Sequence, residues 1–346
     1  MTLKTLRHII PSISGDWRYF PSNYSIFTDD AINQGRIDEA STYISQFTNS
    51  KPIDPNIEFR IMASERQSRY LTQVIGYFLN EFSEEKTIPK ISICNSENTV
   101  FDELNSFEGR FTIYNIERAN NSDFKDSQSL TLSKESSDYW RCINISTDAK
   151  YMLAFEDDAL VIPEFPKYLK SLKKQFDERP HLEYVKLYHP ASLRKLPALP
   201  IELALSLSLS FLFYWFVLNR KYFIYFVIVA TLIYADIHSY GYQFVADVRY
   251  YLTNSVYMSM PESCCMPGVF YRSSILSKLS SDSMKIRSFP EKAKDHILDE
   301  SSFYGLQTDS NLIVHVGAHS SIRHSVVRLS PSVSKTKTLS WSQYLW

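Results

Sequence analysis

The chain has 346 residues, with 37 Lys and Arg against 38 Asp and Glu, and a formal net charge of −1. This length can form one or two α/β domains with a sizeable core, and the near-neutral charge excludes a strongly basic nucleic-acid binder and an acidic tail. The eight glycines lie at least twelve residues apart, so a GxGxxG dinucleotide fingerprint and a GxxxxGK[ST] phosphate loop are both absent. We therefore expect no nucleic-acid partner and no glycine cradle for a nucleotide.

Residues 1–55 are expected to form a polar extension of the main domain. Asp30–Phe47 has the spacing of an amphipathic helix, and Lys51–Pro55 is predicted to be a linker. Met1–Phe20 lacks a seven-residue apolar core, so we expect neither a signal peptide nor an anchor there.

Strand and helix patterns alternate through residues 56–200, the first part of the expected domain. Tyr151–Phe155 is wholly apolar, as buried central strands are. In chain order the patterns predict strand Ile57–Ala63, helix Gln67–Phe82, strands Lys90–Cys94 and Phe111–Asn115, helix Leu132–Ile145, strand Tyr151–Phe155, helix Leu169–Phe176 and strand Tyr184–Leu187.

Residues 201–236 form a separate apolar segment. Thirteen of the sixteen residues of Leu203–Leu218 are apolar, and so is Tyr222–Ala235 except for Thr231. Because the runs are apolar on every face and carry aromatic residues near their ends, we expect a membrane-inserted two-helix hairpin. The runs span only roughly 24 and 21 Å as helices, against roughly 30 Å of bilayer hydrocarbon, so a buried hairpin or strands of a central sheet is the alternative.

The basic tip of this hairpin sets its expected orientation. Asn219–Lys221 would face the cytosol by the positive-inside rule, with both flanking parts of the chain in the lumen. Either the hairpin itself directs insertion, or the sequence lacks the beginning of its gene.

The remaining chain completes the same domain. Residues 237–330 are too few for a comfortable separate domain and predict strand Gly268–Tyr271, helix Ser274–Leu279 and strand Leu312–Val316, followed by a tail over 331–346. Alternating strands and helices imply an α/β fold with a mostly parallel sheet flanked by helices. The domain would be split by the inserted hairpin.

Cysteines and glycosylation sequons agree with a luminal location. Cys94, Cys142, Cys264 and Cys265 allow three pairings, and no Cys/His spacing typical of zinc is present. Three N-x-[ST] sequons lie on the side expected to be luminal, at Asn23, Asn120 and Asn144.

Three adjacent acids follow the apolar central strand. Glu156, Asp157 and Asp158 lie where open α/β sheets bind ligands, beyond a strand's carboxyl end. Burying them requires a counter-charge, and a divalent cation supplies one; oxygen ligands favour Mg²⁺ or Mn²⁺. The alternative is that the acids only complement the dipole of a helix starting near Pro163–Phe165.

Three motifs give this site a family resemblance. YMLAFEDDALVIPEF resembles the metal-binding DxD motif of GT-A-fold glycosyltransferases, written here as EDD. Lys134–Tyr139 (KESSDY) and His315–Ser321 (HVGAHSS) resemble segments of the N-acetylglucosaminyltransferase IV family. Together with a hairpin after the acidic strand and the pair Cys264–Cys265, they resemble the Golgi transferases that add N-acetylgalactosamine to glycosylphosphatidylinositol (GPI) glycans, over roughly residues 57–321.

The resemblance implies a role for each site residue. Asp158 and His315 would bind the metal, although His315 taken alone fits a buried core histidine, and His319 is a weaker candidate. Asp295 would be the general base, although taken alone it fits a solvated surface charge, and the alignment could slip to Asp299 or Glu300. The donor-binding residues would be Arg66, Lys134, Asp138, Glu156 and Asp157, although Arg66 taken alone fits a solvated loop arginine and Asp138 a residue that only caps a turn.

The implied activity is metal-dependent, inverting transfer of N-acetylgalactosamine from UDP-GalNAc to the first mannose of GPI anchors. Its cofactor would be Mn²⁺ or Mg²⁺, and its partners the GPI glycan and the Golgi bilayer. Transfer from UDP-GlcNAc to an N-glycan is one alternative. A non-catalytic membrane adaptor is another, since the anchor usual at the N-terminus in the family was not found.

Overall fold

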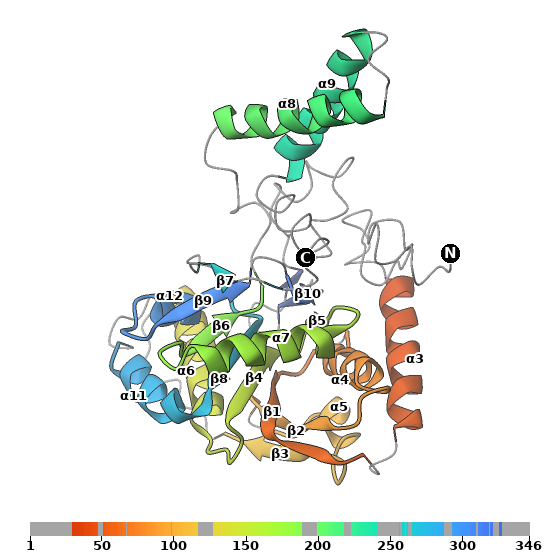
Figure 1. Cartoon of the computed structure of the whole chain (residues 1–346). Helices are drawn as coiled ribbons and strands as arrows, with labels where there is room; N and C mark the ends of the chain where they lie inside the picture. Colours follow the sequence, from red (N-terminus) through yellow and green to blue (C-terminus); the bar gives the residue numbers. More distant parts are fainter. Residues whose placement is uncertain are drawn as a thin grey trace. The chain divides into compact units, whose positions relative to one another are not determined.

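The computed structural model describes residues 30–47, 51–66, 68–97, 99–116, 127–188, 199–217, 223–240, 256, 258–259, 261, 265–286, 293–308, 311–317, 319–320 and 325–326 (Figure 1). These residues belong to two compact units, which are described separately. One is formed by Ser25–His189 with Ser255–Arg328, and the other includes Pro190–Asn254. The expected tip Asn219–Lys221, Cys264, the sequons at Asn23 and Asn120, the tail 331–346 and the extension before residue 30 lie outside the described residues.

An eight-stranded sheet in the order β3-β2-β1-β4-β8-β6-β9-β7 forms the centre of the first unit. Strands β3, β2, β1 and β4 pair in parallel, as do β6 and β9; β8 runs antiparallel between β4 and β6, and β7 antiparallel to β9. The expected mostly parallel sheet is confirmed. The strands are β1 Ile53–Ala63, β2 Ile88–Asn95, β3 Thr112–Asn115, β4 Tyr151–Glu156, β6 Tyr184–Lys186, β7 Met258–Ser259, β8 Gly268–Arg272 and β9 Gly305–Thr308.

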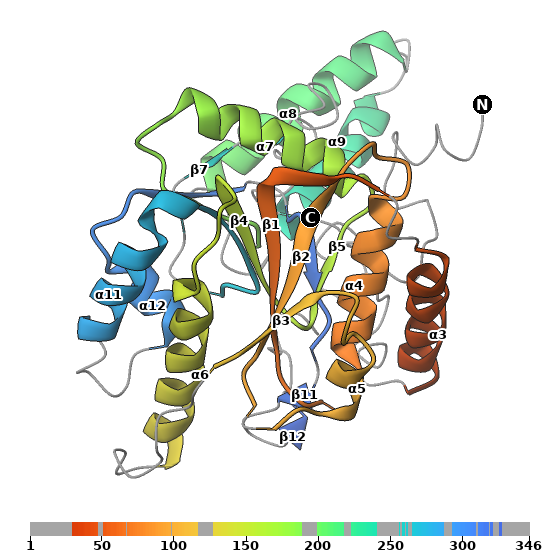
Figure 2. The same cartoon turned by 90° about the horizontal axis from the view of Figure 1, so that it is seen from below.

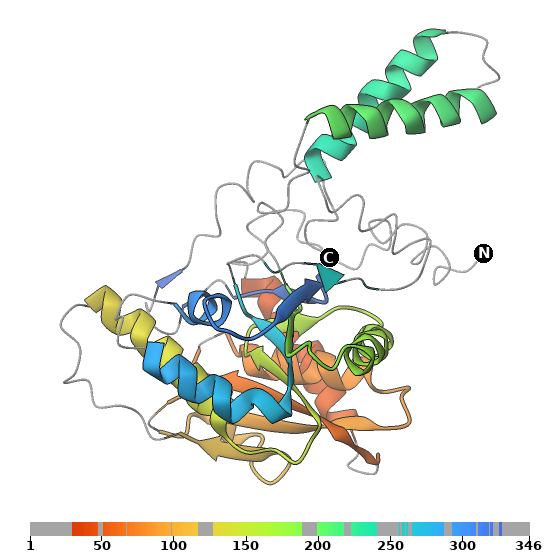
Figure 3. The ribbon, with the colours of Figure 1, turned by 60° about the vertical axis from the view of Figure 1, so that its left-hand side comes forward.

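Helices cover both faces of this sheet. Figure 2 shows α3, α4 and α5 on one side of the strands and α6, α11 and α12 on the other. Figure 3 shows α11 lying alongside α6, with which it is in contact. The helices are α3 Asp30–Gln46, α4 Tyr70–Glu81, α5 Asp102–Asn105, α6 Ser127–Asn144, α7 Phe165–Glu178, α11 Leu276–Ile286, preceded by the 3₁₀ turn Ser273–Ile275, and α12 Lys294–Asp299.

Alternation along the central strands directs side chains into two cores. On one face Phe59 of β1 stacks on Phe78 of α4 with ring centroids 3.8 Å apart, and Phe155 of β4 meets Phe59 edge-on at 4.9 Å. On the other face Met152 of β4 joins the core that α6, α11 and α12 cover. Successive residues of a strand point to opposite faces, so a strand buried on both sides must be apolar throughout. The predicted burial of Tyr151–Phe155 is confirmed.

A disulfide joins the end of β2 to α6. Cys94 bonds to Cys142 across 48 residues, which selects one of the pairings that the sequence left open. Cys265 is also disulfide-bonded. Closing the loop between Cys94 and Cys142, which are 48 residues apart, stabilises the fold by about 4 kcal/mol in the chain-entropy account.

Two apolar helices, α8 (Leu199–Phe216) and α9 (Phe223–Tyr240), form the described part of the second unit and contact each other. Ser206 and Ser210, one turn apart on α8, are buried. Within the described part of the chain, no helix has both the length and the apolar character needed to cross a membrane. The two helices are therefore present, and the expected transmembrane hairpin is not confirmed. More than half of the side chain is exposed at Phe211, Phe216, Ile224 and Leu232.

Some predicted boundaries were wrong. The predicted linker Lys51–Pro55 contains the start of β1, because Ile53 pairs with Ile88 before a register shift at Asp54/Glu58. Helix α4 starts at Tyr70, after Arg69 at φ 47°, a left-handed conformation that no helix continues through. Helices α6 and α7 begin earlier than predicted, and α11 extends further.

A small strand pair lies next to the main sheet, and one of its two strands was predicted. The strand β5 (Ala159–Val161) pairs antiparallel with β10 (Ile313–His315). The strands β11 (His319–Ser320) and β12 (Ser325–Val326) pair in the same way. The strand β10 lies within the predicted strand Leu312–Val316, which is confirmed, whereas β5, β11 and β12 were not predicted.

Candidate metal and donor site

The three acids lie at the carboxyl end of β4. Glu156 is the last residue of the strand, and Asp157 and Asp158 form the turn into β5. Because β5 pairs with β10, His315 lies opposite Ala159, and the N–H of Val316 donates to the carbonyl oxygen of Asp158 at 2.9 Å. This pairing joins two motifs more than 150 residues apart in the sequence.

Glu156, Asp158 and His315 form a potential metal site. Their ligand atoms lie within 4.8 Å of one another. His315 Nε2 is 3.2 Å from Asp158 Oδ1 and 4.0 Å from Glu156 Oε2. Two carboxylates and one imidazole suit a divalent cation such as Mn²⁺. The alternative that the acids only complement a helix dipole is wrong, because β5 separates them from α7, which begins at Phe165.

Arg66 forms ion pairs with two of the three acids. Its Nη2 lies 3.0 Å from Asp157 Oδ1, and its Nη1 lies 2.5 Å from Asp158 Oδ2. The second oxygen of Asp157 accepts the backbone N–H of Ser64 at 2.9 Å. Arg66 and Ser64 follow β1, so the parallel β1–β4 pair delivers the arginine to the acids. Asp157 is thus held on the β1 side, outside the metal triad.

Burial and pairing separate the acids electrostatically. Burial raises the pKa of Asp157 to about 7, in spite of Arg66. For Asp158 burial acts in the same direction, but Arg66 and His315 outweigh it and hold the pKa of this carboxyl well below its usual range. Burial raises the pKa of Glu156, and Asp158 raises that of His315 against the opposing effect of burial. Asp158 is therefore the acid most strongly held as a carboxylate.

Gly317 borders Asp158 and was not singled out in the sequence. A Cβ at this position would lie 1.9 Å from Asp158 Oδ2. No side chain fits there without displacing the carboxylate. The glycine lies within the HVGAHSS motif, which could have indicated it.

Lys294 and Glu135 are further site residues that the sequence analysis did not select. Lys294, the first residue of α12, forms ion pairs with Glu135 of α6 and with Glu156. Its ammonium also lies 5.5 Å from the ring centroid of Tyr139. Glu135 and Tyr139 are one helical turn apart and so share a face of α6. The motif KESSDY indicated the helix, but the predicted residues were Lys134 and Asp138.

The other predicted residues take different positions. Lys134 is half-buried on α6, and Asp138 is buried one turn further along. Asp295 follows Lys294, and its Oδ2 accepts the backbone N–H of Cys265 at 3.0 Å. Asp299 is instead paired with buried Lys186 at 2.6 Å. The side chain of His319 lies outside what the structure describes.

A family model for the GPI-N-acetylgalactosamine transferase PGAP4 matches residues 57–307. The chain belongs to the GPI-N-acetylgalactosamine transferase family. The match contains Arg66, the acidic triplet and Lys294 but ends before His315, which the β5–β10 pairing adds. Membership of this family makes the chain a glycosyltransferase.

Other comparisons add little to the family assignment. No curated protein matches the sequence. The X-ray structure of the mannosyltransferase Ktr4p from S. cerevisiae is similar at 11% identity and a TM-score of 0.29, over 78% of this chain and 72% of that one. A likeness this weak carries no conclusion about the present chain.

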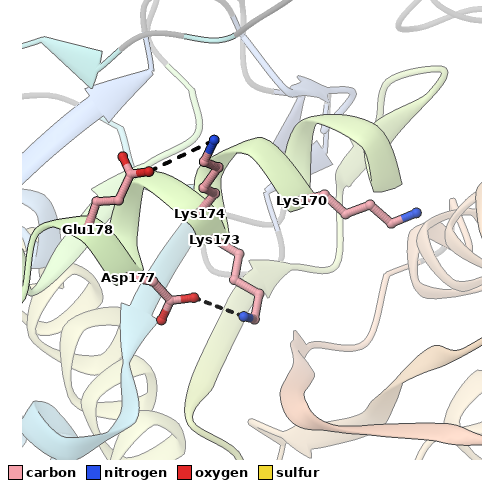
Figure 4. Close-up of a pocket in the computed structure, with 5 residues that line it drawn as sticks. All are labelled: Lys170, Lys173, Lys174, Asp177 and Glu178. Atoms are coloured by element: carbon pink, nitrogen blue, oxygen red, sulfur yellow. Dashed lines mark hydrogen bonds and ion pairs between the residues drawn. The ribbon is translucent and has the colours of Figure 1, made fainter.

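Helix α7 carries a surface hollow of about 400 Å³, which is distinct from the candidate site (Figure 4). Its lysines already face acids: Lys173 lies 2.9 Å from Asp177, and Lys170 lies 2.7 Å from Glu85. Exposed pairs of this kind contribute little energy and leave little net charge for a ligand. None of the predicted site residues lines the hollow, which is formed by Lys170, Lys173, Lys174, Asp177 and Glu178.

Proposed function

We propose that the chain transfers N-acetylgalactosamine from UDP-GalNAc to the first mannose of GPI glycans, with inversion and with Mn²⁺ or Mg²⁺ as cofactor. The family supports the donor sugar and the acceptor class. The juxtaposition of Glu156, Asp158 and His315 is the observation that carries the metal requirement. When bound, the cation would neutralise charge on the departing UDP.

Arg66 and Asp295 supply the remaining chemistry from the chain itself. Arg66 lies against Asp157 and Asp158 and provides a fixed positive charge where a donor diphosphate would approach. Asp295 is half-buried on the first turn of α12, and one carboxylate oxygen is fixed by Cys265. We assign Asp295 the role of the general base that accepts the proton of the acceptor hydroxyl, since inverting transfer needs such a base. Asp299 is a poorer candidate, because Lys186 engages it.

Substitution Asp158→Asn tests the metal site. We expect UDP-GalNAc hydrolysis by the purified protein to be Mn²⁺-dependent and to fall by about 100-fold or more in this variant. The matched control is Asp177→Asn, an exposed acid of α7 that we expect to leave the rate unchanged. Hydrolysis of UDP-GlcNAc alone would contradict the donor assignment. No turnover of any UDP-sugar by the wild-type protein would contradict the enzyme assignment and favour an adaptor.

We further propose that α8 and α9 insert into the Golgi membrane and hold the sheet unit on the luminal side. The exposed apolar side chains of both helices support insertion, because large exposed apolar surface is costly in water. The Cys94–Cys142 disulfide fits an oxidising lumen, and Asn144, the sequon among the described residues, is exposed at the end of α6. A hairpin in the bilayer would keep the active site near a lipid-linked acceptor. Liposome flotation tests the membrane association of these helices.

A further inference from the structure

The structure shows an acid–base–acid bridge beside the proposed metal site, in which the lysine is largely buried and the Glu135 side chain is 39% exposed. Lys294 Nζ lies 2.5 Å from Glu135 Oε1 and is also paired with Glu156 Oε1. The lysine side chain is only 11% exposed, so its charge has few partners other than these carboxylates. Glu156 therefore uses one oxygen for Lys294 and turns the other, Oε2, toward His315.

The same bridge fixes the helix that carries the proposed base. Lys294 and Asp295 are the first two residues of α12, and a helix of six residues has little stability of its own. Its first end is held by Lys294 on α6 and β4, and its last residue, Asp299, is held by Lys186 of β6. In both anchors a buried lysine pairs with acids of other elements, and breaking the ion pairs of a buried charge is destabilising locally.

Tyr139 packs against this lysine and is itself hydrogen-bonded to Tyr271. Their hydroxyls are 2.8 Å apart and buried, and the ring of Tyr139 lies under the Lys294 ammonium. The lysine is thus constrained by packing as well as by charge.

We propose that Lys294 is a positioning residue that couples the metal carboxylate Glu156 to the placement of Asp295, and this rests on the proposed function. The lysine acts in two opposite ways. Its positive charge at Glu156 opposes a divalent cation, while its two ion pairs hold α12 and thereby Asp295 against the site. Loss of Lys294 should therefore strengthen metal binding and weaken turnover, a combination that a purely structural role does not produce.

Substitution Lys294→Met tests the coupling by two independent measurements. We expect Mn²⁺ to bind about tenfold more tightly by calorimetry, since a nearby positive charge is removed. We expect kcat for UDP-GalNAc hydrolysis to fall about 10- to 100-fold, and the amides of residues 294–299 to exchange hydrogen faster. Lys294→Arg should restore most of the wild-type values because it keeps the charge.

Lys186→Met is the matched control. It breaks the other anchor of α12 without touching Glu156, so it should lower kcat and increase amide exchange but leave the Mn²⁺ affinity unchanged. Equal or weaker Mn²⁺ binding by a folded Lys294→Met protein, or unchanged exchange in α12, would overturn the proposal. Mn²⁺ affinity and exchange do not depend on turnover, so they test the coupling even if the wild-type protein hydrolyses no UDP-sugar, a result that would count against the proposed function alone.

Discussion

At the scale of residues, the acids of the site are compensated by arginine and lysine side chains from other elements. Glu156, Asp157 and Asp158 are adjacent, and like charges at this spacing cannot be buried without compensation. Arg66 reaches them from the end of β1 and Lys294 from the start of α12. The three acids are therefore compensated by charges that belong to the protein itself.

Gly317 gives a sharp test at this scale. Gly317→Ala places a Cβ against the Asp158 carboxylate, so we expect weaker Mn²⁺ binding and at least about a 10-fold loss of activity. Gly109→Ala serves as the control: its Cβ meets nothing within 4 Å, and its φ of +75° costs only about 1 kcal/mol of folding free energy. Calorimetry with Mn²⁺ measures the difference. Normal affinity in Gly317→Ala would show that Asp158 does not bind the metal from this position.

At the scale of elements, β1 leads into the site residues Ser64 and Arg66 and also holds the end of helix α6. Buried Arg60 of β1 donates to the carbonyl oxygens of Cys142 at 2.8 Å and Ile145 at 2.7 Å, at the end of α6. Glu58, two residues earlier on the same face, pairs with Arg60 at 2.6 Å. Cations near a helix C-terminus are stabilising, so this pair anchors α6, the helix that carries Glu135.

Acid sensitivity should follow from Glu58. Burial alone would raise the pKa of this carboxyl, but Arg60 and Ser92 outweigh burial and lower it. Its ionised form therefore stabilises the fold above the usual pKa of 4.5, and this stability is lost as the pH falls through the lower pKa of the folded state.

Glu58→Gln should flatten the acid side of the stability profile and cost about 3–5 kcal/mol at pH 7, because the buried Arg60 charge loses its carboxylate counter-charge. Glu85→Gln, which breaks the exposed pair with Lys170, should cost less than about 1 kcal/mol. Urea unfolding between pH 3 and pH 7 measures both. An unchanged acid slope in Glu58→Gln would rule out this pair as the source of the sensitivity.

At the scale of the whole molecule, the sheet is built from chain segments on both sides of α8 and α9. Strand β8 follows these helices in the sequence and inserts between β4 and β6, which precede them. His315 and Lys294 also come from the later segment, and the three acids from the earlier one. The two segments therefore have to fold together to form the site.

Replacing residues 199–240 with a Gly/Ser linker tests whether catalysis and membrane binding belong to different units. The midpoint of thermal unfolding and UDP-GalNAc hydrolysis should be retained, because the described strands and site residues lie outside this segment. Liposome flotation should be lost, since the exposed apolar side chains are removed. A second variant keeps both helices and changes Phe211, Phe216, Ile224 and Leu232 to Ser. Flotation by both variants at the wild-type level would contradict membrane insertion through these helices.

Much of the fold could be predicted from periodicity. The wholly apolar run Tyr151–Phe155 and the alternation in Ile91–Ile93 are local patterns, so the central strands and the α/β class followed from the sequence. The metal candidates Asp158 and His315 followed from motifs that resemble a family, and Arg66 from its place after the first strand. The pairing of β5 with β10 could not be predicted, because it joins segments more than 150 residues apart in the chain.

The sequence by itself determined the family, the α/β sheet and the acidic end of β4, because these depend on residue types at short spacings. Only the tertiary structure decided that Cys94 pairs with Cys142 and that Lys294 bridges Glu135 and Glu156. It also decided that Gly317 borders Asp158. Each of these contacts joins residues far apart in the chain, and their distance is set by the packing of β1, β4, α6 and α12 rather than by any local pattern.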